Sequence, residues 1–171
     1  MRITLIISCL LILFSCKNKE RATAPTTSTP SQEITNVTPA EEQAVAQDSL
    51  LYEYKRGACF GTCPIFNLKI YKSGYATYEG RNHVQMIGTY HSTMNAATLL
   101  KLAQVVDEIK YFSLKDEYDF EGIQDIPAVH STVVRDGVKK SIKNRYQGPS
   151  ELKMLYAAFD EAVANSKWTL E

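Results

Sequence analysis

Two cysteines, Cys59 and Cys63, are the side chains of this chain with the clearest chemical potential. They are four positions apart in the run GACFGTCP. Two thiols at this spacing could form a disulfide, exchange electrons with other thiols, or hold a soft metal such as cuprous copper. The compartment in which the chain folds decides among these uses, because disulfides persist only in oxidising surroundings.

The first sixteen residues indicate that compartment. Arg2 is followed by an apolar run from Ile3 to Phe14 and then by Ser15 and Cys16, which is the outline of a secretory signal. A helix from Ile3 to Cys16 would be roughly 21 Å long at about 1.5 Å per residue, against the roughly 30 Å of a bilayer core. The segment therefore predicts export and is too short for a membrane span.

The residues before Cys16 resemble the lipobox of bacterial lipoproteins, with Leu13 three positions before the cysteine and Ser15 directly before it. The resemblance implies a lipidated Cys16 at the mature N-terminus. Cys9 has a similar outline, but only about five apolar residues precede it, and a signal needs roughly 7–15. The alternative is an ordinary signal peptide cleaved elsewhere, although no A-x-A site lies nearby. Lys17 stands where the inner-membrane retention signal would place aspartate, which favours the outer membrane.

If Cys9 is removed and Cys16 is lipidated, Cys59 and Cys63 are left with each other in an exported chain, so we predict a structural disulfide between them. A loop this short contributes only about 2 kcal/mol through chain entropy. Cys-x-x-x-Cys-Pro also occurs in thioredoxin-fold copper chaperones, where it opens a helix, whereas the residues after Pro64 alternate as in a strand. The spacing also differs from the Cys-x-x-Cys of redox proteins and the Cys-x-x-Cys-His of haem attachment. A thiol-redox or copper-handling pair is the alternative.

Carboxylates and histidines provide the remaining candidates for chemistry. His83 and His91 would be about 26 Å apart on one strand at about 3.3 Å per residue, so they cannot share a metal ion, and His130 belongs to another strand. The carboxylates between Lys115 and Pro127 do not match a calcium-binding loop and are typical of a solvated one. A cation or cationic-peptide site is the alternative for this run, and an enzyme built on this loop is the third hypothesis for the function. The carboxylates concerned are Asp116, Glu117, Asp119, Glu121 and Asp125.

No catalytic residue, metal site or cofactor is predicted, because the sequence contains no nucleophile elbow, Walker loop, zinc-protease motif or dinucleotide fingerprint. The 171 residues carry 19 basic and 19 acidic side chains. A nucleic-acid-binding protein would show a larger basic excess.

The elements that must position these residues lie in one domain. The segment from Lys17 to about Gln47 has no aromatic residue and is rich in Thr, Ser, Pro, Ala, Gln and Glu, so it cannot bury enough apolar surface to fold. We predict a signal peptide over residues 1–15, a lipidated N-terminus and tether over 16–48, and a single domain over 49–171.

Hydrophobic periodicity predicts an α+β fold for this domain. Because short turns join consecutive strands, we expect an antiparallel sheet with both helices packed on one face. The expected order is a strand from Leu50 to Arg56, a hairpin turning at Ser73-Gly74, a strand from Val84 to Tyr90 after a turn at Gly80 to Asn82, a helix capped by Thr93, a hairpin turning at Asp136-Gly137 and a helix from Pro149. Trp168 is expected to pin the end of the last helix. Lys69, Tyr71 and Tyr78 are expected on the outward face of the first hairpin, as a candidate binding surface.

Together these features resemble an uncharacterised family of envelope lipoprotein domains of unknown function. The likeness covers nearly all of Leu50 to Trp168 and is most specific in the cysteine run. It implies no reaction, substrate or cofactor. We therefore predict a lipoprotein of the cell envelope, anchored through Cys16 and facing the periplasm, with a non-enzymatic binding or structural domain whose partner is another envelope protein. The residues that carry the likeness are Arg56, Cys59, Gly61, Cys63, Pro64, Gly74, Gly80 and Gly88.

Overall fold

The computed structural model describes residues 48–171 except residue 124. The signal, most of the tether and Cys16 lie outside the described residues. The elements are β1 (Leu50–Arg56), β2 (Ile65–Tyr71), β3 (Tyr75–Asn82), β4 (Gly88–Thr93), α2 (Ala96–Glu108), the 3-10 helix η1 (Tyr111–Ser113), β5 (Glu117–Tyr118), β6 (Val129–Arg135), β7 (Val138–Asn144), α3 (Glu151–Asn165) and β8 (Thr169–Leu170).

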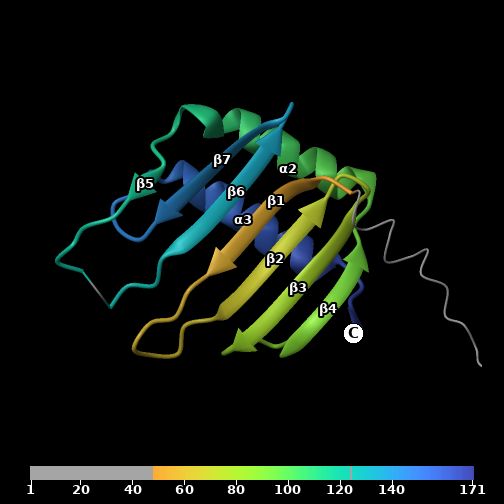
Figure 1. Ribbon diagram of the computed structural model, residues 1–171, viewed down its shortest axis with the longest axis horizontal. Coiled ribbons are helices and arrows are strands. Elements are labelled where there is room, and N and C mark those ends of the chain that lie inside the picture. Colours follow the sequence, from red (N-terminus) through yellow and green to blue (C-terminus); the bar gives the residue numbers. More distant parts are fainter. Residues whose placement is uncertain (1–47, 124) are drawn as a thin grey trace, which may run out of the picture. The chain divides into compact units, whose positions relative to one another are not determined.

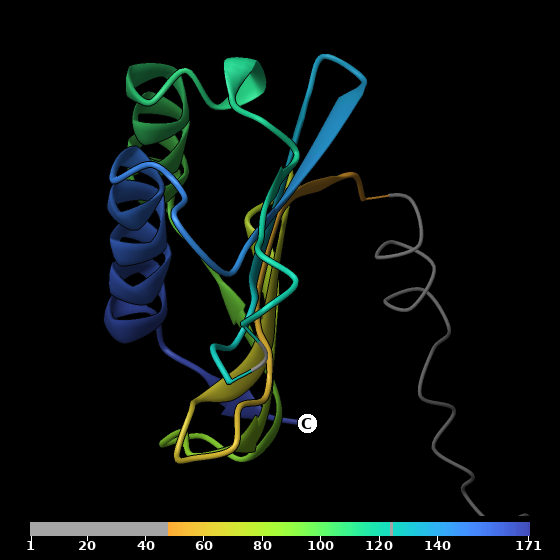
Figure 2. The ribbon, with the colours of Figure 1, turned by 90° about the vertical axis from the view of Figure 1, so that its left-hand side faces the viewer.

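The eight strands form one sheet in the order β5-β7-β6-β1-β2-β3-β4-β8 (Figure 1). Both helices lie on one side of it and leave the other side open (Figure 2). Neither helix in the described part of the chain combines the length and apolar character needed to cross a membrane.

The predicted fold, an antiparallel α+β sheet, was wrong. The domain is mostly sheet and the sheet is mixed, because β5 pairs with β7 in parallel. The backbone N–H of Lys143 donates to the carbonyl of Asp116 across this pair at 2.9 Å. β5 and β8 are each two residues long. A strand this short has no hydrophobic periodicity, so the sequence pattern could not reveal either one.

The first strand in sequence occupies the middle of the sheet. β1 pairs with β2 on one side and with β6 on the other, where Tyr54 lies opposite Ser131. Alternate residues of β1 face the helices, and Tyr52 and Tyr54 are buried. Arg56, the last residue of β1, therefore lies at the end of a central strand.

The connection from β3 to β4 also differs from the prediction. β3 continues through the expected turn at Gly80 to Asn82, and β4 begins at Gly88, whose Cα lies opposite that of Gly80. His83 adopts a positive φ of 52° and begins the actual turn. Gly80 is buried against this connection, and only glycine fits there, because a Cβ would overlap the backbone carbonyl of Met86. A glycine needed for close packing was thus misread as a turn glycine.

Two other local predictions are confirmed, and the predicted cap of α2 is wrong. Asp136 and Gly137 have φ values of 51° and 77°, as a type I′ hairpin turn requires. The indole N–H of Trp168 donates to the carbonyl of Val163 at 2.9 Å and pins the end of α3. The cap of α2 is Asn95 and not Thr93, because the Asn95 side chain accepts from the Thr98 N–H at 2.9 Å.

The core between sheet and helices is rich in tyrosine. The Tyr54 ring lies 5.3 Å from Phe66, 5.6 Å from Tyr156 and 5.0 Å from Phe159, measured between centroids. Buried tyrosines need partners for their hydroxyls. Tyr111 meets this need by donating to the Ser131 carbonyl at 2.8 Å.

Candidate functional site

The segment between β1 and β2, residues 57–64, is a short loop closed by its two cysteines, and we refer to it as the cysteine loop. Cys59 and Cys63 lie at disulfide-bonding distance, with Cα atoms 5.8 Å apart. The N–H of Gly61 donates to the Sγ of Cys59 at 3.3 Å inside the ring. The pair predicted from the sequence is therefore brought together at the end of the central strand.

Phe60 is the most conspicuous side chain of this loop, because 87% of its surface is exposed. The ring that contains it is too small to form a core of its own, and both cysteines are only half-buried. Burying a phenylalanine side chain usually stabilises a fold by about 1.5–3 kcal/mol. The domain gains little of this from Phe60.

The base of the cysteine loop is attached to Ala128, the loop residue directly before β6. The N–H of Gly57 donates to the carbonyl of Ala128 at 3.1 Å. A Cβ at position 57 would lie 3.3 Å from the same carbonyl oxygen, so a larger residue would loosen this contact. Glycine here allows the two backbones to approach.

A charged cluster beside Gly57 secures the same base. The Nε of Arg56 donates to the Tyr54 hydroxyl at 2.6 Å, and its Nη2 donates to the Oδ2 of Asp160 in α3 at 2.9 Å. The guanidinium also lies over the rings of Tyr54 and Phe66, 5.5 and 5.9 Å from their centroids. These contacts tie the end of β1 to the helix layer.

Asp160 is the one carboxyl of this cluster, and its pKa is raised. Burial is the main cause, while the charge of Arg56 and a hydrogen bond with Tyr54 act in the opposite direction. The Asp160 side chain remains 49% exposed. Its polar contacts are with Arg56 and Tyr54, so Asp160 has a structural role and holds the base of the cysteine loop against α3.

A second loop, residues 119–128 with residue 124 outside the description, approaches the cysteine loop through Ala128. Two of its apolar side chains are exposed, Phe120 by 60% and Ile126 by 41%. Phe120 nonetheless has a packing partner in Tyr146, at a centroid distance of 6.2 Å. We call this segment the acidic loop, because it carries Asp119, Glu121 and Asp125 and no basic residue.

Ion pairs account for the first carboxylates of the predicted acidic cluster. Asp116 pairs with Lys140, and Glu117 pairs with Lys143 at 2.8 Å. Asp119 pairs with Lys143 at 2.6 Å, and the hydrogen bond from Lys143 is the main cause of its lowered pKa. These pairs join β5 to β7. Within residues 48–171, residue 124 aside, no group of three or more His, Cys, Asp or Glu side chains is placed to hold a metal ion.

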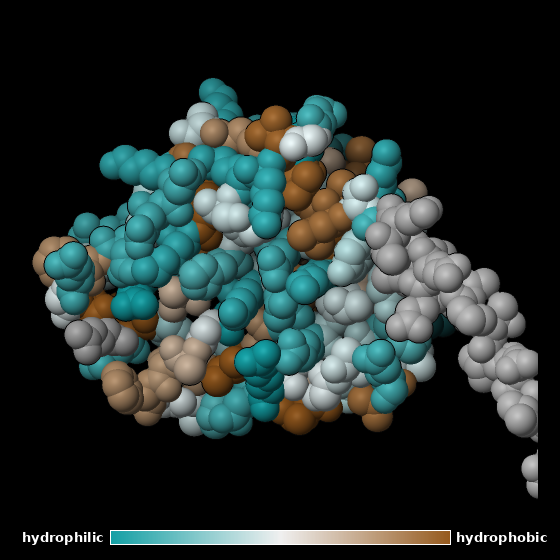
Figure 3. Space-filling view, in the orientation of Figure 1, coloured by the Kyte–Doolittle hydropathy of each residue, from teal (hydrophilic) through white to brown (hydrophobic). Residues whose placement is uncertain are grey.

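The candidate binding surface on the first hairpin is only partly brought together. Lys69 and Tyr71 lie on the open side of the sheet, which is largely hydrophilic (Figure 3). Tyr78 was wrongly placed with them: it is 4% exposed and its ring lies 5.2 Å from that of Phe66 in the core. The register sets Thr77 beside Lys69 and Tyr78 beside Leu68, and Leu68 faces the helices.

The prediction that His83 and His91 lie on one strand was wrong. His83 lies in the β3–β4 turn, so the spacing along one strand does not apply to it. His130 lies opposite Lys55 and Lys143 on the neighbouring strands. Burial, followed by the charges of Lys55 and Lys143, lowers the pKa of His130.

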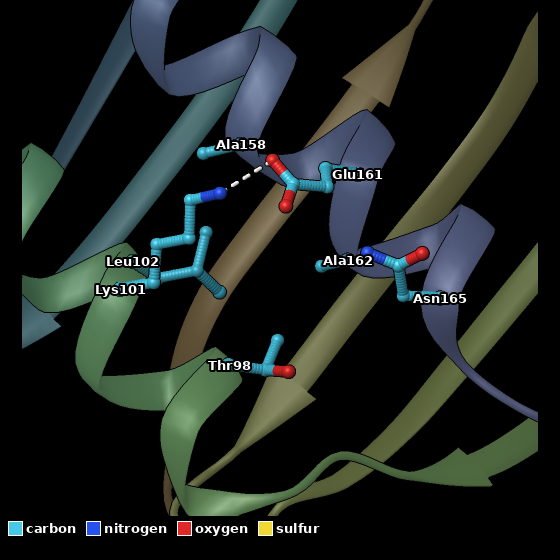
Figure 4. A pocket seen from close by; sticks show the side chains of 7 residues that line it. All are labelled: Thr98, Lys101, Leu102, Ala158, Glu161, Ala162 and Asn165. Atoms are coloured by element: carbon cyan, nitrogen blue, oxygen red, sulfur yellow. Dashed lines mark hydrogen bonds and ion pairs between the residues drawn. The ribbon is translucent and has the colours of Figure 1, made fainter.

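A small groove lies between the two helices (Figure 4). Lys101 of α2 and Glu161 of α3 form an ion pair across it. Its volume is about 30 Å³, which is room for one or two water molecules, whereas sites for organic ligands are usually about 300–1,000 Å³. This groove is too small for a metabolite.

The prediction from sequence missed Phe60, Phe120 and Asp160. An aromatic residue inside so short a cysteine ring has no interior to enter, and this would have identified Phe60. Asp160 follows Tyr156 by four positions, so it borders the apolar stripe of α3. Its pairing with Arg56, 104 positions away, has no local signal.

Comparison with sequence families matches residues 51–163 to a family described as Domain of unknown function (DUF6438). The matched range runs from the second residue of β1 almost to the end of α3 and includes both loops. Comparison with curated proteins gives no match.

Proposed function

This chain belongs to the DUF6438 family, and from that premise we propose that it is a membrane-anchored lipoprotein of the cell envelope whose domain binds another envelope protein without catalysing a reaction. The observation that carries this proposal is the exposure of Phe60 at the tip of a loop closed by two cysteines. A phenylalanine that the fold holds in solvent is available for contact with another molecule.

The support beneath Phe60 argues for the same role. Arg56 and Gly57 attach the loop base to α3 and to the loop residue Ala128 directly before β6. A loop held from both sides loses little conformational entropy when it binds. The domain thus supplies a preorganised contact point, as expected of a binding module.

The anchor completes the proposal. A lipidated Cys16 would hold the chain at the membrane, and the tether, about thirty residues, would span on the order of 30 Å as a coil. More than one acyl chain would make the attachment stable. This arrangement would let the domain reach a partner while it stays attached to the outer membrane, on the periplasmic side.

Replacing Cys16 tests the anchor. We expect Cys16→Ser to abolish incorporation of an alkyne-labelled fatty acid and to remove the mass of the lipid from the mature protein. Cys9→Ser is the matched control and should be labelled like the natural chain, because the predicted signal peptide that contains it is removed. Full labelling of Cys16→Ser, or loss of labelling in Cys9→Ser, would contradict the proposed anchor.

The proposal gives the cysteine pair a structural role. β2 begins two residues after Cys63, so no helix N-terminus lies next to the pair to stabilise a thiolate. Structural disulfides of exported proteins have reduction potentials below about −300 mV. We expect the reduction potential of the Cys59–Cys63 pair to lie in the same range. Titration of the full chain in dithiothreitol redox buffers measures it. Equilibration near about −200 mV, or tight binding of one cuprous ion by the reduced chain, would favour the thiol-redox or copper alternative.

A further inference from the structure

We infer that the cysteine loop and the acidic loop form one docking surface, and that it fits a protein with an apolar pocket rimmed by lysine and arginine side chains. This inference rests on the proposed function and adds the location of the surface and the chemistry of the partner. It follows from three features: the two loops are joined, both expose apolar side chains, and the charge around those side chains is negative.

The two loops are neighbours at one end of the sheet. The hydrogen bond from Gly57 to Ala128, 3.1 Å long, joins the base of one to the end of the other. Two perpendicular views place them at the same end of the domain (Figures 1 and 2). A partner that contacts one loop is therefore within reach of the other.

Both loops expose apolar side chains: Phe60 by 87%, Phe120 by 60% and Ile126 by 41%. Hydrophobic spheres border the hydrophilic sheet face over these loops, at the lower left of Figure 3. Isolated exposed side chains are common on proteins, but a group of them on adjoining loops is typical of an interaction site.

Hydrogen bonds hold the backbone of the acidic loop at Phe120 and Ile123. The N–H of Phe120 donates to the Asp119 side chain at 2.8 Å, and the N–H of Ile123 donates to the Phe120 carbonyl at 3.0 Å. Arg145 donates to the Ile123 carbonyl at 3.2 Å. The exposure of Phe120 is thus built into the folded loop.

The charge at this surface selects the partner. The cysteine loop carries no charged residue, and the acidic loop carries no basic one. Asp119 is neutralised by Lys143 and Arg145. Glu121 and Asp125 are exposed, and neither forms an ion pair with the part of the chain that the structure describes. Negative charge beside apolar side chains favours a basic protein surface and opposes the anionic headgroups of a membrane.

Peptide panning tests the inference although the partner is unidentified. The probe is a phage-displayed library of random twelve-residue peptides, selected on the full-length lipidated protein in detergent. We expect the enriched peptides to combine aliphatic or aromatic residues with flanking lysine or arginine. Their affinities are then measured by fluorescence anisotropy for the natural chain and for each variant.

Phe60→Ala should weaken the binding of these peptides about tenfold or more, as expected for a central aromatic contact. Glu121→Gln combined with Asp125→Asn should weaken it severalfold and reduce its dependence on salt. Leu100→Ala is the matched control, because Leu100 lies on α2 and is 59% exposed. It should leave the affinity unchanged. Circular dichroism of each variant checks that it is folded.

Three outcomes would overturn the inference. If Lys69→Ala or Tyr71→Ala removes binding and Phe60→Ala does not, the open sheet face is the binding surface, and the proposed function still stands. If Phe60→Ala reduces sedimentation of the protein with phosphatidylglycerol vesicles, the surface contacts lipid. If no basic peptide is enriched, the assigned partner chemistry is wrong, while the labelling of Cys16 tests the anchor separately.

Discussion

Raising the pH from 8 to 12 is expected to unfold the domain cooperatively, with the tyrosine hydroxyls ionising as the fold is lost. The cause is the set of tyrosines in the core. Burial raises the pKa of Tyr54 and Tyr111 well above the ordinary value of 10.0, and it raises the pKa of Tyr78 to about 12. Each group is neutral in the folded state at a pH where the unfolded chain would already be ionised.

The sign of the effect follows from these shifts. Because the folded state favours the neutral phenol, its contribution to stability is complete below pH 10 and is lost as the pH rises through the folded-state pKa. At pH 12 the loss of stability is about 2–3 kcal/mol for each tyrosine that stays neutral in the fold. For Tyr54 and Tyr111 together, this relation lowers the free energy of unfolding by about 5 kcal/mol. The whole free energy of unfolding of many domains is about 5–15 kcal/mol.

Absorbance at 295 nm and far-ultraviolet circular dichroism, recorded in the same titration, measure this prediction. The late rise in tyrosinate absorbance should coincide with the loss of the dichroism signal between about pH 11 and 12. A prompt return to pH 8 should restore both signals and serves as the control for chemical damage to the cysteine pair. Ionisation of all ten tyrosines near pH 10 with the fold intact would contradict the buried environment of these side chains.

Gly80→Ala is expected to destabilise the domain by about 3 kcal/mol or more. The added Cβ would overlap the backbone carbonyl of Met86 and would lie 3.0 Å from the Tyr78 ring. The Met86 carbonyl belongs to the β3–β4 connection, so relief of the overlap requires β4 to move away from β3. A flexible side chain could yield, whereas this backbone cannot yield without loss of pairing.

Thermal and urea unfolding of Gly80→Ala and of a control, Gly61→Ala, measure this effect. Gly61→Ala is the matched control, because the nearest atom to its Cβ is the Cys59 sulfur at 3.9 Å. We expect the Gly80→Ala melting temperature to fall by roughly 10 °C and that of Gly61→Ala to stay within about 2 °C of the natural chain. Equal melting temperatures for the two variants would show that β3 and β4 do not pack as described.

Features of this domain that depend on neighbouring residues could be predicted from the sequence. The alternation from Phe66 to Ile70 placed the buried face of β2, and helical spacing placed Leu102 and Val106 of α2 in the core. The Asp136-Gly137 turn was recognised for the same reason: positive φ values at adjacent positions restrict the residue types that fit. The cysteine pair belongs here too, because two thiols four positions apart can meet without help from the rest of the fold.

The loop that bears Phe60 could thus be predicted from the sequence, whereas the residues that it contacts were decided by the tertiary structure. Arg56 meets Asp160 only because β1 lies under α3 in the folded domain. Tyr78 is buried because the β2–β3 register sets it beside Leu68, and a shift of one residue would have turned it outward. β5 pairs with β7 through two residues, too few to leave a periodic pattern. Sequence by itself determined the local conformations, since these depend on backbone preferences and near neighbours, while the contacts between distant segments were decided only when the sheet and the helices packed together.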